Sequence, residues 1–205
     1  MNIYPKIIPI FPLSGVIYFP KTNLPLNVFE QRYLSLVDDA YKKDKLMGMV
    51  QSRSDNDTVY KVGCLGKISD YQKSKDGRIL INLTGITRFK ILEEITNNKL
   101  YREFSVNYKN FENDLTKETS QINMSTLIEK AKLFFKRNGL LLNWKEFDKL
   151  DQSQKVNTLA MISPVTNEEK QKILETVTIN NKINVLEDII EFYLHEVNFD
   201  NQTIQ

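Results

Sequence analysis

Cysteine and histidine are almost absent from this chain of 205 residues, which contains one of each, Cys64 and His195. A single cysteine cannot form an intrachain disulfide or supply the thiolate cluster of a structural zinc site, and it is typical of a reducing compartment. Any Ser–His or Cys–His pair would have to use His195, but no G-x-S-x-G nucleophile motif accompanies it, so we expect an ordinary helix-surface histidine. The sequence therefore predicts no catalytic residue, no metal site and no cofactor.

Long apolar runs and an excess of charge are also missing. No run approaches the roughly 20 residues that span a bilayer, and the N-terminus lacks the basic region and cleavage site of a signal peptide. The 28 Lys and Arg residues against 26 Asp and Glu residues leave a net charge of +2. This balance gives no electrostatic support for a nucleic-acid partner. We therefore expect a soluble cytoplasmic protein that binds no membrane.

Proline is concentrated rather than scarce, because four of the six prolines lie in residues 9–33, PIFPLSGVIYFPKTNLPLNVFEQRY. Each proline fixes φ and removes a backbone donor, so this segment cannot form one continuous helix. We expect a bent ribbon with short strands over 6–10 and 16–28, joined by a turn around Gly15. A helix should follow from about Phe29.

The residues after this ribbon predict one helix and then a run of strands. The apolar face of the helix is formed by residues spaced three and four apart: Tyr33, Leu34, Val37, Ala40 and Tyr41. Alternation of apolar and polar residues predicts the strands, over 46–50, 60–71, 78–83, 88–95 and 102–108. Gly63 and Gly66 within the second strand indicate bulges or tight curvature, as in a closed barrel.

The pattern changes to helical after a polar stretch without periodicity. We therefore predict three parts: a β-rich domain over 1–110, a linker over 111–122 and a helical bundle over 123–200. Helices are expected from Thr126, with Glu129 completing a capping box, over 151–162, and from a cap at Asn167. The last helix has the clearest apolar seam: Ile183, Leu186, Ile190, Tyr193 and Val197.

Four fragments, in this order and spacing, resemble the N-terminal substrate-binding domain of Lon proteases, which also occurs as a stand-alone protein and in cereblon. They are the ribbon 9–33, VGCLGKI, DGRILINLTGITRFKI and LAMISPVTNEEKQKILE. The resemblance implies an α+β fold in which a β-rich pseudo-barrel, like that of PUA domains, contains one inserted helix and precedes a helical bundle. It also implies a non-enzymatic module, because the sequence lacks the G-x-x-x-x-G-K-[ST] phosphate loop and the Ser–Lys peptidase domain of the full-length protease.

The leading hypothesis is a module that binds exposed or extended polypeptide, as an adaptor or chaperone-like factor in proteolysis whose partner is a protease or a chaperone. Binding could use apolar contacts or strand addition at an open sheet edge. The candidate residues are Tyr18, Phe19, Phe29, Arg32, Tyr33 and Arg88. A structural role competes for each: the aromatic residues could be core, and Glu30 could pair with an arginine such as Arg88 across the barrel, since a buried charge needs a partner.

Two other functions remain open at this point. A PUA-like module could bind RNA through two basic runs, formed by Lys42, Lys43 and Lys45 and by Lys73, Lys75 and Arg78. Few aromatic residues interleave with these runs, so a solvated surface explains them as well. A hydrolase would need a concave site with convergent polar groups, which no motif indicates. The oligomeric state is not predicted.

Overall fold

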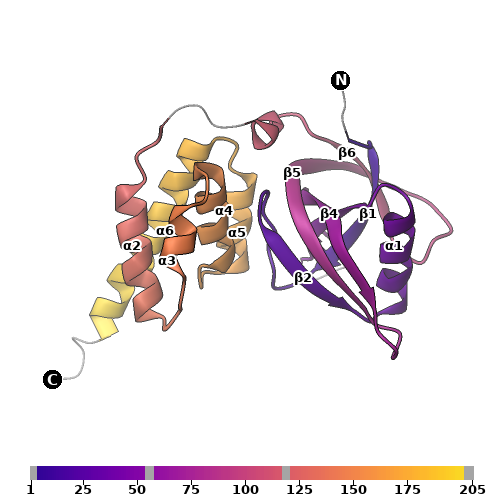
Figure 1. Cartoon of the computed structure of the whole chain (residues 1–205). Coiled ribbons are helices and arrows are strands. Elements are labelled where there is room, and N and C mark those ends of the chain that lie inside the picture. The colour runs from indigo at the N-terminus through magenta and orange to yellow at the C-terminus, as the bar shows by residue number, and fades with distance from the viewer. Residues whose placement is uncertain (1–3, 54–57, 117–120, 201–205) are drawn as a thin grey trace. The chain divides into compact units, whose positions relative to one another are not determined.

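The computed structural model describes residues 4–53, 58–116 and 121–200, with side chains described as far as residue 195. The chain divides into two compact units, Met1–Lys117 (unit 1) and Glu118–Gln205 (unit 2), which are described separately (Figure 1). In the described residues, unit 1 contains a six-stranded sheet and unit 2 is helical. The predicted α+β class is therefore confirmed.

Unit 1 is a closed barrel with one additional strand. Its elements in chain order are β1 (Ile7–Leu13), β2 (Asn23–Val28), α1 (Gln31–Lys42), β3 (Leu46–Gln51), β4 (Val62–Lys73), β5 (Ile79–Ile95), β6 (Glu103–Asn107) and the 3₁₀ turn η1 (Glu112–Leu115). The strand order is β2-β5-β4-β3-β1-β6, and β5 also pairs with β6. Five strands therefore close on themselves through the β5–β6 pair, and β2 stands outside that closure. Only the β1–β3 pair is parallel among the pairings of the described strands.

The length of β5 makes this arrangement possible. Its first part, up to Thr84, pairs with β2, and its last part, from Lys90, pairs with β6. Strand β4 pairs with β5 from Ile79 to Lys90 and so occupies the other edge. Strands β2 and β6 therefore share one edge of β5, one after the other along its length.

The barrel interior is filled by apolar side chains that alternate along the strands, namely Ile8, Ile10, Val50, Leu65, Phe89, Ile91, Phe104 and Val106. Gly48 faces this cluster, because a Cβ atom there would lie 2.4 Å from Cδ1 of Ile10 and 2.9 Å from Cζ of Phe89. The predicted curvature near Gly66 is confirmed, since the β4–β5 register shifts between Leu65 and Gly66.

The helix α1 lies against the barrel, but its buried face is rotated from the predicted one. Leu36 is buried beside Tyr33, Val37 and Ala40, whereas Leu34 is half-buried. Tyr41 is exposed and stacks on Tyr71 of β4, with ring centroids 4.3 Å apart.

The predicted strand over 16–28 is wrong in its first half, because strand pairing begins only at Asn23. Residues 16–22 instead form an irregular segment, with a turn at 20–21, that crosses β5. The N–H of Lys21 donates to the carbonyl of Gly85, and the N–H of Gly85 donates to the carbonyl of Thr22. A Cβ atom on Gly85 would lie 2.3 Å from the Phe19 carbonyl oxygen, so this crossing requires glycine. The prediction of two separate strands over 78–83 and 88–95 is also wrong, since β5 continues through Gly85 as one strand.

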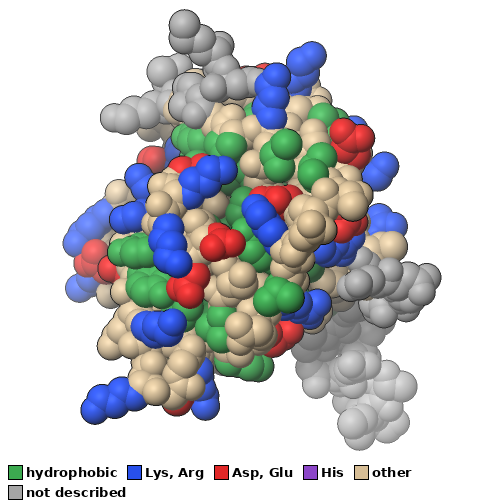
Figure 2. All heavy atoms as spheres, turned by 90° about the vertical axis from the view of Figure 1, so that its right-hand side faces the viewer, with side chains coloured by type: hydrophobic (Ala, Val, Ile, Leu, Met, Phe, Trp, Pro, Cys, Tyr) green, Lys and Arg blue, Asp and Glu red, His purple; other side chains and the backbone are tan. Residues whose placement is uncertain are grey.

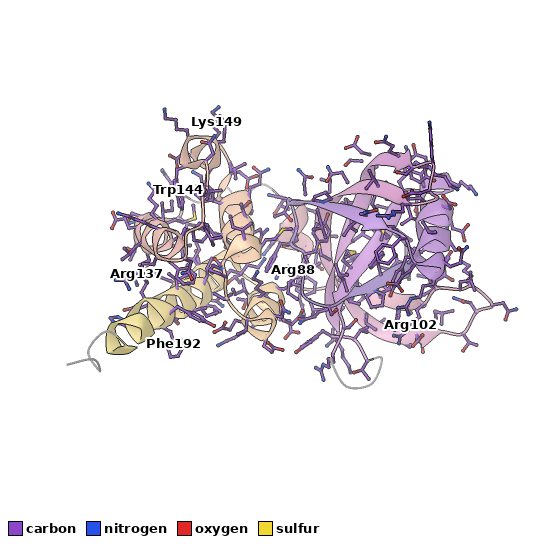
Figure 3. The ribbon with its side chains drawn as sticks, turned by 90° about the horizontal axis from the view of Figure 1, so that it is seen from below. Arg88, Arg102, Arg137, Trp144, Lys149 and Phe192 are labelled. Atoms are coloured by element: carbon purple, nitrogen blue, oxygen red, sulfur yellow. The ribbon has the colours of Figure 1, made fainter. Side chains whose placement is uncertain are left out.

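Unit 2 consists of α2 (Ser125–Arg137), α3 (Trp144–Asp148), α4 (Gln152–Ile162), α5 (Asn167–Glu175) and α6 (Ile179–Asp200). In the predicted seam of α6, Ile183, Leu186 and Ile190 are buried, but Tyr193 is only half-buried, and the side chain of Val197 lies outside the described residues. The short α3 was not predicted. Its Trp144 ring lies 5.9 Å from Phe135 and 5.3 Å from Phe147 between ring centroids (Figure 3).

Two predicted helix caps are wrong. The helix α2 begins at Ser125 after Met124, which makes no side-chain cap bond, so the capping box proposed for Thr126 does not form. The helix α5 is capped by Thr166, one residue before the predicted Asn167, and its capping box is completed by Glu169. In both cases the predicted element exists and only its first residue is displaced.

The predicted linker over 111–122 is not tested as a boundary, and residues 117–120 lie outside the described residues. Its first part belongs to unit 1, because Phe111 is buried there and η1 contacts β5. The three-part division therefore stays a prediction.

Candidate functional site

Three of the six candidate residues are inside unit 1 and present no surface to a ligand. Phe19 is fully buried, and Tyr18 is buried with its hydroxyl donating to the carbonyl of Leu83 at 2.7 Å. Burial raises the pKa of Tyr18 above its ordinary value, so the phenol stays a neutral hydrogen-bond donor. These two aromatic residues therefore pack the core.

Arg88 on β5 is also buried, and its partner is Asp114 on η1 (Figure 3 labels Arg88). The carboxylate accepts from the backbone N–H of Arg88 at 2.9 Å, from Nε at 2.9 Å and from Nη2 at 2.8 Å. The guanidinium carbon lies 4.5 Å from the centroid of Phe111. This pair joins the segment after the barrel to β5, so Arg88 has a structural role.

The predicted pairing of Glu30 with an arginine across the barrel is therefore wrong. Glu30 pairs with Arg32, two residues away, with 3.0 Å between Nη2 and the carboxylate, and both side chains are about half exposed. The short loop before α1 places the two charges side by side at the surface. Water solvates both charges there, so neither requires a partner across the barrel.

The other three candidates, Phe29, Arg32 and Tyr33, line one cavity of about 290 Å³, which we call the β1–β2 groove. One wall is the end of β1, and the other is the second half of β2 with the start of α1. The lining residues are Phe11, Pro12, Leu13, Ser14, Leu26, Asn27, Val28, Phe29, Glu30, Arg32, Tyr33 and Ser52.

An aromatic stack lies along one side of the β1–β2 groove. The rings of Phe11 and Tyr33 are stacked at 4.0 Å between centroids, with 20° between their planes. Arg32 lies over the Tyr33 ring at 4.5 Å from its centroid. The groove thus combines an aromatic surface, a few hydroxyl and amide groups, and one internally neutralised charge pair.

Phe29 is the exposed member of this set, with 67% of its surface accessible. It also lines a second hollow of about 730 Å³ on the other side of the α1 N-terminus, bordered by Asp38, Lys42, Lys73 and Arg78. Phe29 therefore stands on the ridge between an aromatic groove and a charged hollow.

The basic runs proposed for RNA are interspersed with carboxylates. Arg78 pairs with Asp76 at 3.0 Å, and Lys45 lies over the Tyr41 ring. Figure 2 shows this side of unit 1, where blue Lys and Arg side chains alternate with red Asp and Glu side chains. The geometry on this face does not favour a phosphate backbone, which requires clustered positive charge.

His195 lies exposed on α6, with Nε2 at 3.7 Å from the Glu191 carboxylate. In the residues that the structure describes, no three His, Cys, Asp or Glu side chains gather in a way that could hold a metal ion. None of the helices in that same part of the chain is both long enough and apolar enough to cross a bilayer.

Comparisons with known proteins agree on one family. The family model for the ATP-dependent protease La (LON) substrate-binding domain matches residues 7–191. A Lon protease of Syntrophus aciditrophicus is 28% identical over 206 residues, which cover 93% of this chain and 25% of the relative. A Lon protease of Dictyoglomus thermophilum is 23% identical, with 87% and 23% covered. The chain thus spans about a quarter of the length of these relatives.

Two solved structures share the fold. The crystal structure of a Lon N-terminal domain protein from Xanthomonas campestris has a TM-score of 0.67 at 18% identity, covering 88% of this chain and 96% of that one. The N-terminal domain of a Mycobacterium avium complex Lon protease has a TM-score of 0.67 at 19% identity, covering 91% and 98%. At this identity the likeness concerns the fold, and it confirms the predicted order of β-rich pseudo-barrel and helical bundle.

Proposed function

The chain belongs to the LON substrate-binding domain family, and from this premise we propose that it is a recognition module for exposed or extended polypeptide, which binds in the β1–β2 groove. The family match covers a substrate-binding domain and no catalytic one. A non-enzymatic role, as an adaptor or chaperone-like factor beside a protease or chaperone, is part of this proposal. The cytoplasmic location stays a prediction.

The exposed ring of Phe29 carries the proposal. A Phe side chain gains free energy when its apolar surface leaves water, and this one stays exposed at the rim of a groove that already contains an aromatic stack. Aromatic residues next to a cavity are frequent centres of binding energy. An apolar side chain of an unfolded segment would cover the exposed Phe29 ring, while the buried Tyr33 ring supports the wall of the groove.

The groove also explains why the ligand would be an unfolded segment rather than a small polar molecule. Its charged residues, Glu30 and Arg32, already neutralise each other, and its remaining polar side chains are Ser14, Asn27, Ser52 and the Tyr33 hydroxyl. Such a site discriminates by apolar contact and by main-chain hydrogen bonds, which suits many sequences.

The test compares Phe29→Ala with Phe192→Ala, a matched change of an exposed phenylalanine on α6 in unit 2 (Figure 3). The probe is fluorescently labelled, reduced and carboxymethylated α-lactalbumin, and binding is followed by anisotropy. We expect Phe29→Ala to weaken binding about tenfold, equivalent to about 1.4 kcal/mol, and Phe192→Ala to leave it unchanged.

Both variants should keep the wild-type melting temperature, since both rings are mainly exposed. No binding of the wild-type protein at tens of micromolar would refute the proposal. Equal affinities of the wild-type protein and Phe29→Ala would show that the binding site is not in the β1–β2 groove.

A further inference from the structure

We propose that the polypeptide enters the β1–β2 groove as an added β-strand, hydrogen-bonded to the free edge of β2. This inference rests on the proposed function and specifies how the same site recognises its ligand. The ligand is an extended polypeptide segment whose central side chains are uncharged.

The lining of the groove shows that it follows the edge of β2. Three consecutive residues, Leu26, Asn27 and Val28, border the cavity. Successive side chains of a strand point to opposite faces of the sheet, so a cavity against one face would contact only alternate residues. Contact with all three places the cavity along the strand edge, and in the described residues only the opposite edge of β2 is paired, with β5.

Pro25 fixes which backbone groups of β2 point to that free edge. It lies opposite Asn82 of β5, and it has no N–H to donate. In a hydrogen-bonded antiparallel pair the two residues exchange two N–H···O bonds, which Pro25 cannot do. The Pro25–Asn82 pair must therefore be a non-hydrogen-bonded pair, with the backbone groups of Pro25 turned away from β5. Asn27, two residues along, then turns its N–H and carbonyl the same way, toward the groove.

The end of β1 offers an acceptor on the facing wall. The carbonyl of Leu13 accepts from the N–H of Ser52 on the β3 side. Carbonyls alternate in direction along a strand, so the carbonyl of Pro12 points away from β3. There it accepts from the Tyr33 hydroxyl at 3.5 Å, the outer limit of a hydrogen bond. A strand beside β2 would therefore lie between two walls that both present backbone groups.

The charge of the groove selects the side chains of that strand. Glu30 and Arg32 are already paired with each other, so an entering charged residue would lose water without gaining a free partner. An apolar or aromatic side chain carries no such desolvation cost and gains contact with the exposed Phe29 ring, in a groove whose wall contains the largely buried Phe11–Tyr33 stack. The main chain of the ligand thus supplies general affinity, and every second side chain supplies selectivity.

The test uses the wild-type protein and a fluorescein-labelled peptide, Ser-Gly-Thr-Val-Thr-Phe-Thr-Val-Thr-Gly-Ser, with a single N-methyl group moved along its seven central amides. A methyl group removes one N–H donor and blocks pairing on that side of the strand. Because donors alternate between the two edges of a strand, the loss of affinity should alternate with a period of two residues, by about fivefold between neighbouring positions.

A second measurement changes the protein at Asn27, which is exposed on β2. Asn27→Pro removes the N–H at the free edge and should weaken binding of the unmethylated peptide well beyond Asn27→Ala, which truncates the same groove-lining side chain but keeps that N–H. Circular dichroism and the melting temperature check that both variants fold. If Asn27→Pro does not fold, the methyl scan alone decides.

The outcomes separate this inference from the proposed function. If the unmethylated peptide binds, Phe29→Ala weakens it and the methyl scan shows no alternation, strand addition is refuted while the groove remains the site. If neither this peptide nor the unfolded protein binds, the proposed function fails and strand addition fails with it. An alternating scan with a loss at Asn27→Pro supports strand addition.

Discussion

Two arginine–carboxylate pairs of unit 1 have the same chemistry and opposite surroundings. In the Arg88–Asp114 pair the side chains are 1% and 8% exposed, whereas in the Arg32–Glu30 pair they are 52% and 47% exposed. The buried carboxylate accepts three hydrogen bonds from a residue 26 positions away. The exposed pair joins residues two positions apart and borders the groove.

This difference shows that burial, rather than residue type, separates charges with a structural role from solvated surface charges. A buried charge that loses its partner keeps its full desolvation penalty, while an exposed one is solvated and screened. A third pair, Arg102–Glu94, is intermediate, with exposures of 29% and 46% and distances of 2.7 and 2.6 Å. Arg102 lies in a different part of unit 1 from Arg88 (Figure 3).

The largest expected effect comes from breaking the buried pair. Asp114→Ala leaves the guanidinium of Arg88 buried without its carboxylate, and we expect the free energy of unfolding to fall by about 3–5 kcal/mol. Arg88→Met leaves the carboxylate unpaired and should lower the melting temperature markedly as well. Urea denaturation of each variant measures the change.

The control for this prediction is the double variant Arg88→Met with Asp114→Leu, which removes both charges together. It should recover much of the stability lost by either single change, because apolar residues can replace a buried ion pair. Single variants as stable as the wild-type protein would contradict the structural role assigned to Arg88.

A smaller, pH-dependent effect is expected at the intermediate pair. The hydrogen bonds from Arg102 lower the pKa of Glu94 from its ordinary value of 4.5. A carboxyl group whose pKa is lower in the folded state stabilises the protein above its unfolded pKa, and this contribution is lost as the pH falls through the folded pKa. Wild type should therefore lose slightly more stability than Glu94→Gln below about pH 4.5, by less than about 1 kcal/mol since solvent screens this partly exposed pair.

Thermal unfolding of both proteins between pH 6 and pH 3 measures this difference, and added salt should reduce it. Parallel curves for the two proteins over the whole range would show that the pair contributes nothing.

The smallest effect is expected at the exposed pair. Glu30→Gln removes one charge but leaves Arg32 solvated and still 4.5 Å from the Tyr33 ring centroid. Stability should change by less than about 0.5 kcal/mol by denaturation. A loss as large as that of Asp114→Ala would overturn the comparison between the two pairs.

The fold was largely predictable from sequence, and the candidate site only in part. Alternation and proline placement located most strands, yet residues 16–22 are an irregular segment because Gly85 lets them cross β5 closely. The displaced caps of α2 and α5 show that Ser, Thr and Asn at neighbouring positions compete for the same role. The partner of Arg88 was missed because Asp114 lies in a segment with no periodicity, assigned to a linker.

What the sequence determined by itself is the family and the order of the elements, because prolines, alternation and helical spacing act locally along the chain. Which of the six candidates can contact a ligand was decided only by the tertiary structure. The pairing of β5 with β4 and β6 closes the barrel, in which Tyr18, Phe19 and Arg88 are buried, and β2 pairs along only one edge in the described residues. Phe29, Arg32 and Tyr33 reach the groove because that edge leads directly into α1. Nothing local in the sequence distinguishes these three groove-lining residues, of which Tyr33 is itself only 6% exposed, from the other candidates, since accessibility depends on strands more than 40 residues away.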